Sequence, residues 1–282
     1  MNYFDNVRRF SFFIAPRRSG HSITAHLLSA HPCILFCDEL DALMWIDEGF
    51  SAEQVYALIK YQNQRLGRPG RKKSGYSYKI PDSWQYRWDK YPEVVGDSKG
   101  DKSTFRMADD PSFLSKLRDR LGVPIRAFVQ ARHPYAIASS EMRNRKWSKS
   151  KTVDKVIAEI EGMEVAAAQL EDAEKLTVYH EDVLRESRHW FEKMFSFLEV
   201  EPMEEILKQC ADKVWKEPGK SRKKRQPEPK KDADTLRLDE AMRKSSVFSR
   251  YLDDPDLYMP KIVDPSTDFV GRVKRKIRRM RQ

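Results

Sequence analysis

The first chemically informative segment of this chain is a loop of arginine, serine and glycine that follows an apolar run. Residues 11–15 form the run, which is typical of a strand buried on both faces. The loop after it contains, in order, Arg17, Arg18, Ser19, Gly20, His21 and Ser22. Guanidinium groups, hydroxyls and the amides at a helix start all donate to phosphate or sulfate oxygens. The segment is therefore a candidate anion-binding loop; an ordinary strand–turn–helix with two solvated arginines is the alternative.

The order of residues in this loop limits what it could bind. Pro16 stops the strand, and Gly20 permits a tight turn and a close approach of the backbone to a ligand. Ser19 and Ser22 are expected to cap the following helix, whose start favours negative charge. Gly20 is followed by His21, where the loops that bind ATP or GTP require lysine and then serine or threonine. An ATP or GTP site is therefore a weak interpretation.

A second segment follows the same plan further along the chain. Residues 126–131 are a strand candidate, and Arg132 comes directly after them. Ligands of open α/β sheets bind at the carboxyl ends of the strands, which is where Arg132 is expected. Pro134 suits a first helical turn, and Ser140 lies eight residues after Arg132, about two helical turns on. An arginine and a hydroxyl on one face suit a terminal phosphate; the alternative is an arginine that ends a strand and a serine that packs.

Together the two segments resemble the sulfotransferases that use 3′-phosphoadenosine-5′-phosphosulfate (PAPS), in the bacterial or Golgi-type branch with a carboxylate base. The first resembles that family's 5′-phosphosulfate loop, of general form P-R-S-G-[TS]-[TS]. The second resembles its 3′-phosphate motif, R-x-P followed by a serine. Further similarities follow in order at residues 27–32, 94–99, 176–183 and 195–198. The resemblance implies an α/β fold with a central parallel sheet flanked by helices, the P-loop-like sulfotransferase fold.

The resemblance also assigns residues to the two ends of PAPS, which would be the cosubstrate, with no metal. The 5′ end would be held by the loop residues Arg17, Arg18, Ser19, Gly20, His21 and Ser22. The 3′-phosphate would be held by Arg132 and Ser140. His21 stands where the family commonly has threonine, and its imidazole could replace the hydroxyl as a donor.

Sulfonate transfer needs a base that takes the proton of the acceptor. We favour Glu39, because family members with a carboxylate base carry a glutamate in a similar place after the loop helix. Asp38 is its immediate rival, and His21 and His133 are further candidates. The alternative interpretation is a surface acidic pair in a loop.

The departing phosphate needs cations. Arg18 is the first candidate and Lys99 the second, and Lys79 could serve instead of Lys99. Residues 217–225 resemble, in position and charge, the basic loop that many sulfotransferases close over the 3′-phosphate, which makes Arg222 a further expected contact. A charged run of this kind is otherwise a solvated surface or a linker.

Composition narrows the class of protein. The chain has 282 residues, enough for one large α/β domain or, as the less favoured alternative, two domains, and its formal net charge is +10. Three cysteines give no even disulfide framework, which favours a reducing compartment. No signal peptide and no apolar run long enough to span a bilayer is recognised, so a cytoplasmic enzyme, peripheral to a membrane at most, is expected.

We expect one sulfotransferase domain over residues 1–260 and a basic tail over 261–282. Residues 61–93, rich in aromatic residues, arginine and proline, are expected to be an insertion that lines the acceptor site. The acceptor is a small molecule, a glycan or a peptide. Residues 270–281 form a basic amphipathic pattern that could rest on an anionic membrane surface. Nonspecific nucleic-acid binding or a solvated tail are the other interpretations, and nucleic acid is the less favoured partner of the whole protein.

The sequence therefore predicts a PAPS-dependent sulfotransferase that moves a sulfonate group to an acceptor hydroxyl or amine by in-line transfer. Two other classes remain open. A small-molecule kinase with a P-loop-like fold would need metal-binding acids and usually a lysine directly after the loop glycine. A basic protein that binds nucleic acid or membranes without catalysis would depend on its charged segments rather than on Arg18 or Arg132.

Overall fold

The computed structural model describes most of the chain, namely residues 3–67, 72–73, 76–77, 79–80, 91–214 and 232–253. The chain divides into two units. The first comprises Met1–Arg132 and Gly162–Lys220, and the second His133–Glu161 and Ser221–Gln282.

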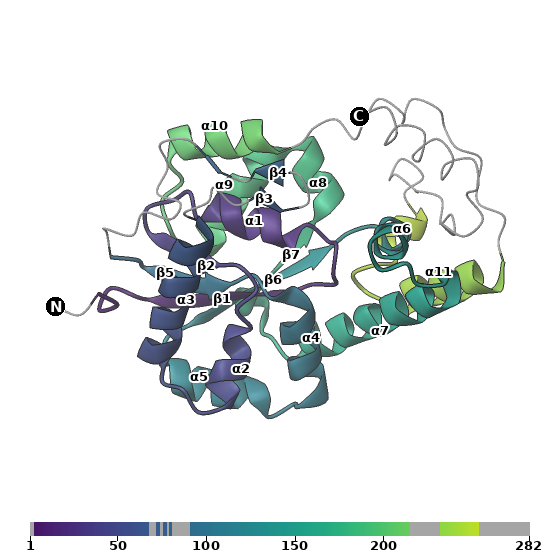
Figure 1. Cartoon of the computed structure of the whole chain (residues 1–282), viewed down its shortest axis with the longest axis horizontal. Coiled ribbons are helices and arrows are strands. Elements are labelled where there is room, and N and C mark those ends of the chain that lie inside the picture. Colours follow the sequence, from purple (N-terminus) through teal and green to yellow (C-terminus); the bar gives the residue numbers. More distant parts are fainter. Residues whose placement is uncertain are drawn as a thin grey trace, which may run out of the picture. The chain divides into compact units, whose positions relative to one another are not determined.

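The centre of the first unit is a five-stranded sheet in which every neighbouring pair is parallel. Its strands are β1 (Arg9–Ile14), β2 (Ile34–Cys37), β5 (Val94–Asp97), β6 (Ile125–Ala131) and β7 (Lys175–Tyr179), in the spatial order β2-β5-β1-β6-β7 (Figure 1). The strands at both motifs begin slightly earlier than the apolar runs predicted. The expected parallel sheet is confirmed.

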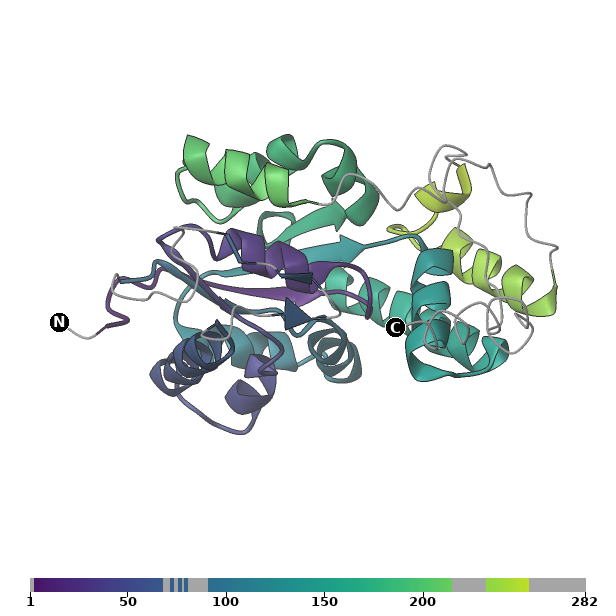
Figure 2. The ribbon, with the colours of Figure 1, turned by 45° about the horizontal axis from the view of Figure 1, so that its top comes forward.

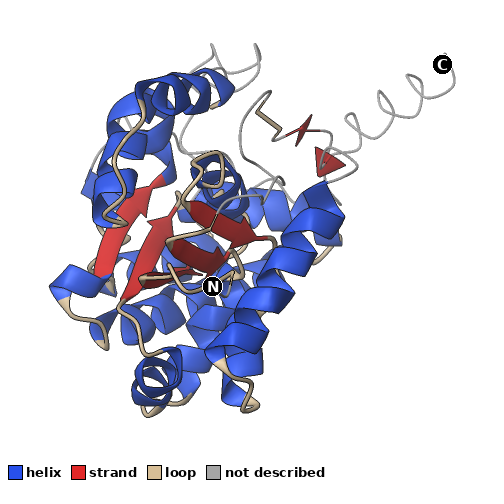
Figure 3. Cartoon of the chain, turned by 90° about the vertical axis from the view of Figure 1, so that its left-hand side faces the viewer, coloured by secondary structure: helices blue, strands red, loops and turns tan. Residues whose placement is uncertain are grey.

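Helices cover both faces of this sheet, as Figures 1 and 2 show. On one face lie α1 (His21–Leu28), α9 (Ser187–Phe197) and α10 (Glu204–Lys213), with α8 (His180–Arg185) leading from β7 into α9. On the other lie α2 (Ala42–Asp47), α3 (Ala52–Gly67), α4 (Gly100–Asp109) and α5 (Phe113–Leu121). Figure 3 separates the strands and helices by colour. A 3-10 turn, η1 (Asp172–Glu174), precedes β7, and β3 (Lys72–Lys73) pairs antiparallel with β4 (Tyr76–Ser77).

The core between the sheet and the α1 side is aromatic. Phe13 of β1 stacks on Phe128 of β6 with ring centroids 5.1 Å apart, and Leu27 of α1 and Phe195 of α9 join the same buried cluster. All four side chains are fully buried. Burial on this scale fixes the strands and α1 relative to each other, so the loop between β1 and α1 has rigid supports at both ends.

The second unit is helical in its described part. It contains α6 (Pro134–Arg145), the start of α7 (Lys149–Ala168), α11 (Ala233–Lys244) and α12 (Arg250–Asp253). The hydroxyl of Tyr135 on α6 donates to the carboxylate of Asp239 on α11. A turn over residues 246–249 separates α11 from α12. There Ser245 Oγ accepts from the amides of Val247 and Phe248, which competes with helical hydrogen bonds.

Several predictions fall partly or wholly outside the described residues. Of the expected insertion over residues 61–93, residues 61–67 form the end of α3 and residues 72–73 and 76–77 form β3 and β4, while residues 81–90 lie outside. Arg222, the basic loop around it and the tail over residues 261–282 also lie outside. No helix in the described ranges is long and apolar enough to cross a membrane.

Replacing Gly96 by alanine is expected to destabilise the sheet. A Cβ at this position of β5 would lie 2.3 Å from the carbonyl oxygen of Ser11 and 2.4 Å from Cε1 of Phe36. The oxygen belongs to the neighbouring strand and cannot move away without disturbing the ladder. Overpacking of this kind costs about 1–3 kcal/mol, and urea unfolding of Gly96→Ala should show a loss of that size. An unchanged unfolding midpoint would contradict the close packing of β5 on β1.

Candidate functional site

The strand order places two loops side by side at the carboxyl edge of the sheet. The chain leaves β1 toward β2 and β5 on one side, and β6 and β7 lie on the other, so β1 stands where the topology changes direction. Ligands of open α/β sheets bind at this point. At this edge the first predicted motif follows β1 and the second follows β6. These two strands are neighbours, and their pairing extends to Ile14 and Val129.

The loop after β1 requires glycine at position 20. Gly20 is the N-cap of α1 with φ of 95°, and a Cβ there would lie 2.6 Å from Nδ1 of His180. Capping by Ser19 or Ser22 is wrong, because α1 has no side-chain cap and the Ser19 hydroxyl instead lies 2.9 Å from Nδ1 of His21. The first amides of α1 thus keep their capacity to bind an anion. His21, expected as a loop donor, is buried and engaged with Ser19.

The end of β6 is hydrogen-bonded to this loop. Nη1 of Arg132 donates to the carbonyl oxygen of Arg18 at 2.9 Å, and Nε2 of Gln130 donates to the carbonyl oxygen of Ser19 at 3.3 Å. The structure therefore joins Arg132 to the β1 loop. Ser140 lies on α6 in the second unit, so its pairing with Arg132 at one phosphate stays a prediction.

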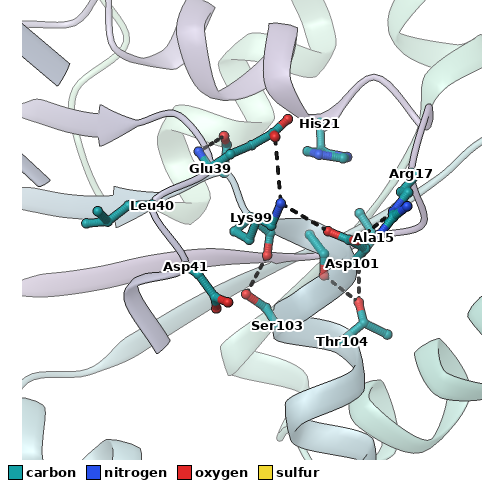
Figure 4. Close-up of polar contacts among 12 residues, drawn as sticks. Ala15, Arg17, His21, Glu39, Leu40, Asp41, Lys99, Asp101, Ser103 and Thr104 are labelled. Atoms are coloured by element: carbon teal, nitrogen blue, oxygen red, sulfur yellow. Dashed lines mark hydrogen bonds and ion pairs between the residues drawn. The ribbon is translucent and has the colours of Figure 1, made fainter. Parts of the chain in front are cut away.

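A chain of four charged side chains runs beside the loop (Figure 4). Nε of Arg17 donates to Oδ2 of Asp101 at 2.6 Å. Nζ of Lys99 lies 3.7 Å from Oδ1 of Asp101 and 3.7 Å from Oε2 of Glu39, so it bridges the two carboxylates. The structure thus brings together three residues predicted for the site, Arg17, Lys99 and Glu39, through an acid that the sequence did not single out.

Close docking of α4 on β1 places Lys99 and Asp101 at the loop. A Cβ at Gly100 would lie 2.8 Å from Cβ of Ala15, so only glycine allows this approach. Oγ1 of Thr104 accepts from the amide of Ala15 at 3.0 Å and donates to the carbonyl oxygen of Gly100 at 2.8 Å. The first turn of α4 is therefore fixed to Ala15, the residue directly after β1.

Glu39 lies in a strained turn whose backbone amides are hydrogen-bonded to the side chain of Asp97. Glu39 and Asp41 both have positive φ, 53° and 63°, which non-glycine residues rarely adopt. Oδ2 of Asp97 accepts from the amide of Ala42 at 2.8 Å, and Oδ1 accepts from the amide of Leu40 at 3.1 Å. Burial raises the pKa of Asp97, while these hydrogen bonds and one from Cys37 oppose the rise. A buried carboxyl thus organises the turn that presents Glu39.

The turn separates the two carboxylates proposed as base. Asp38 is buried, and its Oδ1 accepts from the Ser98 hydroxyl at 3.2 Å. Glu39 is exposed and pairs with Lys99. The arrangement favours Glu39, because it alone of the two combines solvent access with a nearby cation.

Two candidates remain, His133 and Lys79. His133 belongs to the second unit, where it is the N-cap of α6 and accepts from the amide of Tyr135. Lys79 is exposed. Across the described ranges, no group of three His, Cys, Asp or Glu side chains could hold a metal ion.

Replacing Asp101 by asparagine is expected to lower stability in a pH-dependent way. Burial alone would raise the pKa of Asp101, but the Arg17 hydrogen bond and the charges of Lys99 and Arg17 outweigh it and hold that pKa below its ordinary value. A carboxyl with a lowered pKa in the folded state stabilises the fold above its unfolded pKa, about 3.9, and loses this contribution as pH falls through the folded pKa.

Urea unfolding of Asp101→Asn at neutral pH should therefore show a free energy of unfolding lower by about 1–3 kcal/mol. The difference from wild type should shrink below about pH 4. Asp119→Asn, at an exposed position on α5, is the matched control and should change little. A difference that is the same at acid and neutral pH would contradict the role of the Asp101 charge.

Comparison with known proteins gives structural similarities only. No protein-family model matches the sequence, and no curated protein matches it either. The sulfotransferase domain of the Synechococcus PCC 7002 olefin synthase is 17% identical with a TM-score of 0.44, covering 72% of this chain and 76% of that chain. The sulfotransferase domain from the curacin biosynthetic pathway is 15% identical with a TM-score of 0.49, covering 83% and 96%. Retinol dehydratase, in complex with androsterone and inactive cofactor PAP, is 13% identical with a TM-score of 0.37, covering 96% and 78%.

These TM-scores lie below 0.5, and such similarities carry no argument about the function of this chain.

Proposed function

We propose that this protein is a sulfotransferase that moves a sulfonate group from PAPS to an acceptor hydroxyl or amine. The observation that carries the proposal is the junction of the two motifs: Arg132 at the end of β6 is hydrogen-bonded to the loop after β1. Two proposed anion-binding elements in contact at one sheet edge suit a nucleotide with phosphates at both ends. A nucleotide with phosphates at its 5′ end only would leave the second element without a phosphate to bind.

The proposed binding roles follow from the donors at each element. The amides at the start of α1, with Arg18 and Ser22, hold the 5′-phosphosulfate at the uncapped helix end. Arg132 supplies a guanidinium fork for the 3′-phosphate, and Ser140 is the proposed second ligand there. Arg17 contributes positive charge from a position fixed by Asp101.

The proposed chemical step uses Glu39 and Lys99. Glu39 accepts the proton of the acceptor, whose oxygen or nitrogen forms a bond to sulfur while the bond from sulfur to the bridging oxygen of the 5′-phosphate breaks. The bond electrons go to the leaving adenosine 3′,5′-bisphosphate. Lys99, with Arg18, stabilises the charge that develops on this phosphate. Nζ of Lys99 lies 3.7 Å from Oε2 of Glu39, so the proposed base and the proposed cation are direct neighbours.

The test of the proposal is a transfer assay with sulfur-labelled PAPS and, separately, phosphate-labelled ATP. Sugars, phenols and peptides are offered as acceptors to wild type and to Lys99→Ala. Lys116→Ala, which removes an exposed lysine of α5, is the control. We expect label transfer from PAPS alone, abolished in Lys99→Ala and unchanged in Lys116→Ala. Transfer from ATP instead would overturn the proposal in favour of a kinase.

A further inference from the structure

Gln130 is a fully buried polar residue in the otherwise apolar second half of β6. It lies near the carboxyl end of β6 between Val129 and Ala131, and its side chain is fully buried. Burying an amide costs free energy unless its hydrogen bonds are made. Nε2 donates to the carbonyl oxygen of Ser19, but Oε1 has no hydrogen-bond partner among the described residues. An apolar side chain of similar size would avoid this cost, so stability alone does not account for Gln130.

The bond from Gln130 fixes the orientation of one peptide group of the loop. The peptide between Ser19 and Gly20 is planar and trans, as are all peptide bonds in the described part of the chain, so its C=O and N–H point in opposite directions. Because the carbonyl oxygen of Ser19 is held toward Gln130, the amide of Gly20 points away from β6. Gly20 is the N-cap of α1, a helix whose start has no side-chain cap.

The side chains around Gly20 further restrict the orientation of the Ser19–Gly20 peptide. A Cβ on Gly20 would lie 2.6 Å from Nδ1 of His180 and 3.4 Å from Nε2 of Gln130, so both side chains lie directly against the loop backbone. Arg132, the residue directly after β6, donates to the preceding carbonyl, that of Arg18. Two successive carbonyl groups of the loop are thus tied to β6.

We propose that Gln130 is a positioning residue: it turns the Ser19–Gly20 peptide so that the Gly20 amide donates to the anion bound by the loop. The inference rests on the proposed function in taking that anion to be the 5′ end of PAPS. Gln130 does not touch the reacting atoms; it acts through the backbone of the loop.

The test is Gln130→Met, which keeps the length of the side chain and removes its donor. Calorimetry with adenosine 3′,5′-bisphosphate should give a Kd about tenfold higher than wild type. The urea midpoint should change little, because removing the unpartnered Oε1 offsets the loss of the donor to the carbonyl oxygen of Ser19. Ser11→Ala is the matched control, because Ser11 is also fully buried in the sheet with an unpartnered oxygen among the described residues. It should leave the Kd unchanged.

An unchanged Kd with a lowered urea midpoint would overturn the proposal, because Gln130 would then serve the fold alone. If wild type binds no bisphosphate, the proposed function fails, and the amide signal of Gly20 in NMR spectra of the free protein decides the positioning role. A shift or doubling of that signal in Gln130→Met, with the signal of Gly122 unmoved, would support it. An unchanged Gly20 signal would contradict the positioning role of Gln130.

Discussion

Glu39→Gln is expected to lower the rate of sulfonate transfer by a factor of about 10²–10⁴ while adenosine 3′,5′-bisphosphate still binds. An amide cannot accept the acceptor's proton, and general base catalysis contributes about this factor. The side chain of Glu39 is exposed, and its contact with Lys99 places it beside a cation proposed for the leaving phosphate. Nucleotide binding does not depend on this carboxylate in the proposed site.

The rate is measured with labelled PAPS and the best acceptor of the screen, in wild type, Glu39→Gln, Asp38→Asn and Glu48→Gln. Glu48→Gln removes an exposed carboxylate at the end of α2 and should be unaffected. Asp38→Asn should lose less than Glu39→Gln, because Asp38 is buried against Ser98. A full rate in Glu39→Gln together with a large loss in Asp38→Asn would move the base to Asp38.

Arg132→Ala is expected to raise the Kd for adenosine 3′,5′-bisphosphate by about 100-fold. The substitution removes two interactions at once: the guanidinium proposed to hold the 3′-phosphate, and the hydrogen bond to the carbonyl oxygen of Arg18. A hydrogen bond to a charged group contributes about 1.5–3 kcal/mol, and the combined loss exceeds a factor of ten.

Binding of 5′-AMP distinguishes the two contributions of Arg132, since this nucleotide lacks the 3′-phosphate. Its affinity should fall less than that of the bisphosphate in Arg132→Ala. Arg126→Ala, at the start of the same strand and paired with Glu199, is the control. Equal losses for both nucleotides would mean that Arg132 only supports the loop and does not bind the 3′-phosphate.

The strands at both motifs could be predicted from the sequence because they are short apolar runs that end at proline or arginine. Their spatial order could not. β5 lies between β1 and β2, and β6 pairs with the other side of β1, through contacts between residues far apart in the sequence. Composition and periodicity report only on local neighbours, so they indicate a parallel sheet without its order.

In the candidate site, too, single residues could be predicted from the sequence but the contacts between them could not. Arg17, Lys99 and Glu39 were each predicted singly, but the acid that links them was not, since Asp101 reads as an ordinary acid in the first turn of a helix. Arg17 and Asp101 are 84 positions apart, which only the docking of α4 on β1 overcomes. Gln130 did leave a signal, a polar residue inside an apolar strand. The capping by Ser19 failed because His21 competes for its hydroxyl.

The measurement that most directly tests the central claim, a nucleotide site with two anion-binding ends, is calorimetry of adenosine 3′,5′-bisphosphate beside ATP and 5′-AMP, in wild type and Arg18→Ala. The account predicts that wild type binds the bisphosphate much more tightly than either of the others, and that Arg18→Ala weakens this binding. Equal affinity for ATP, or no effect of Arg18→Ala, would contradict the account. Either result would favour a kinase or a basic binding protein.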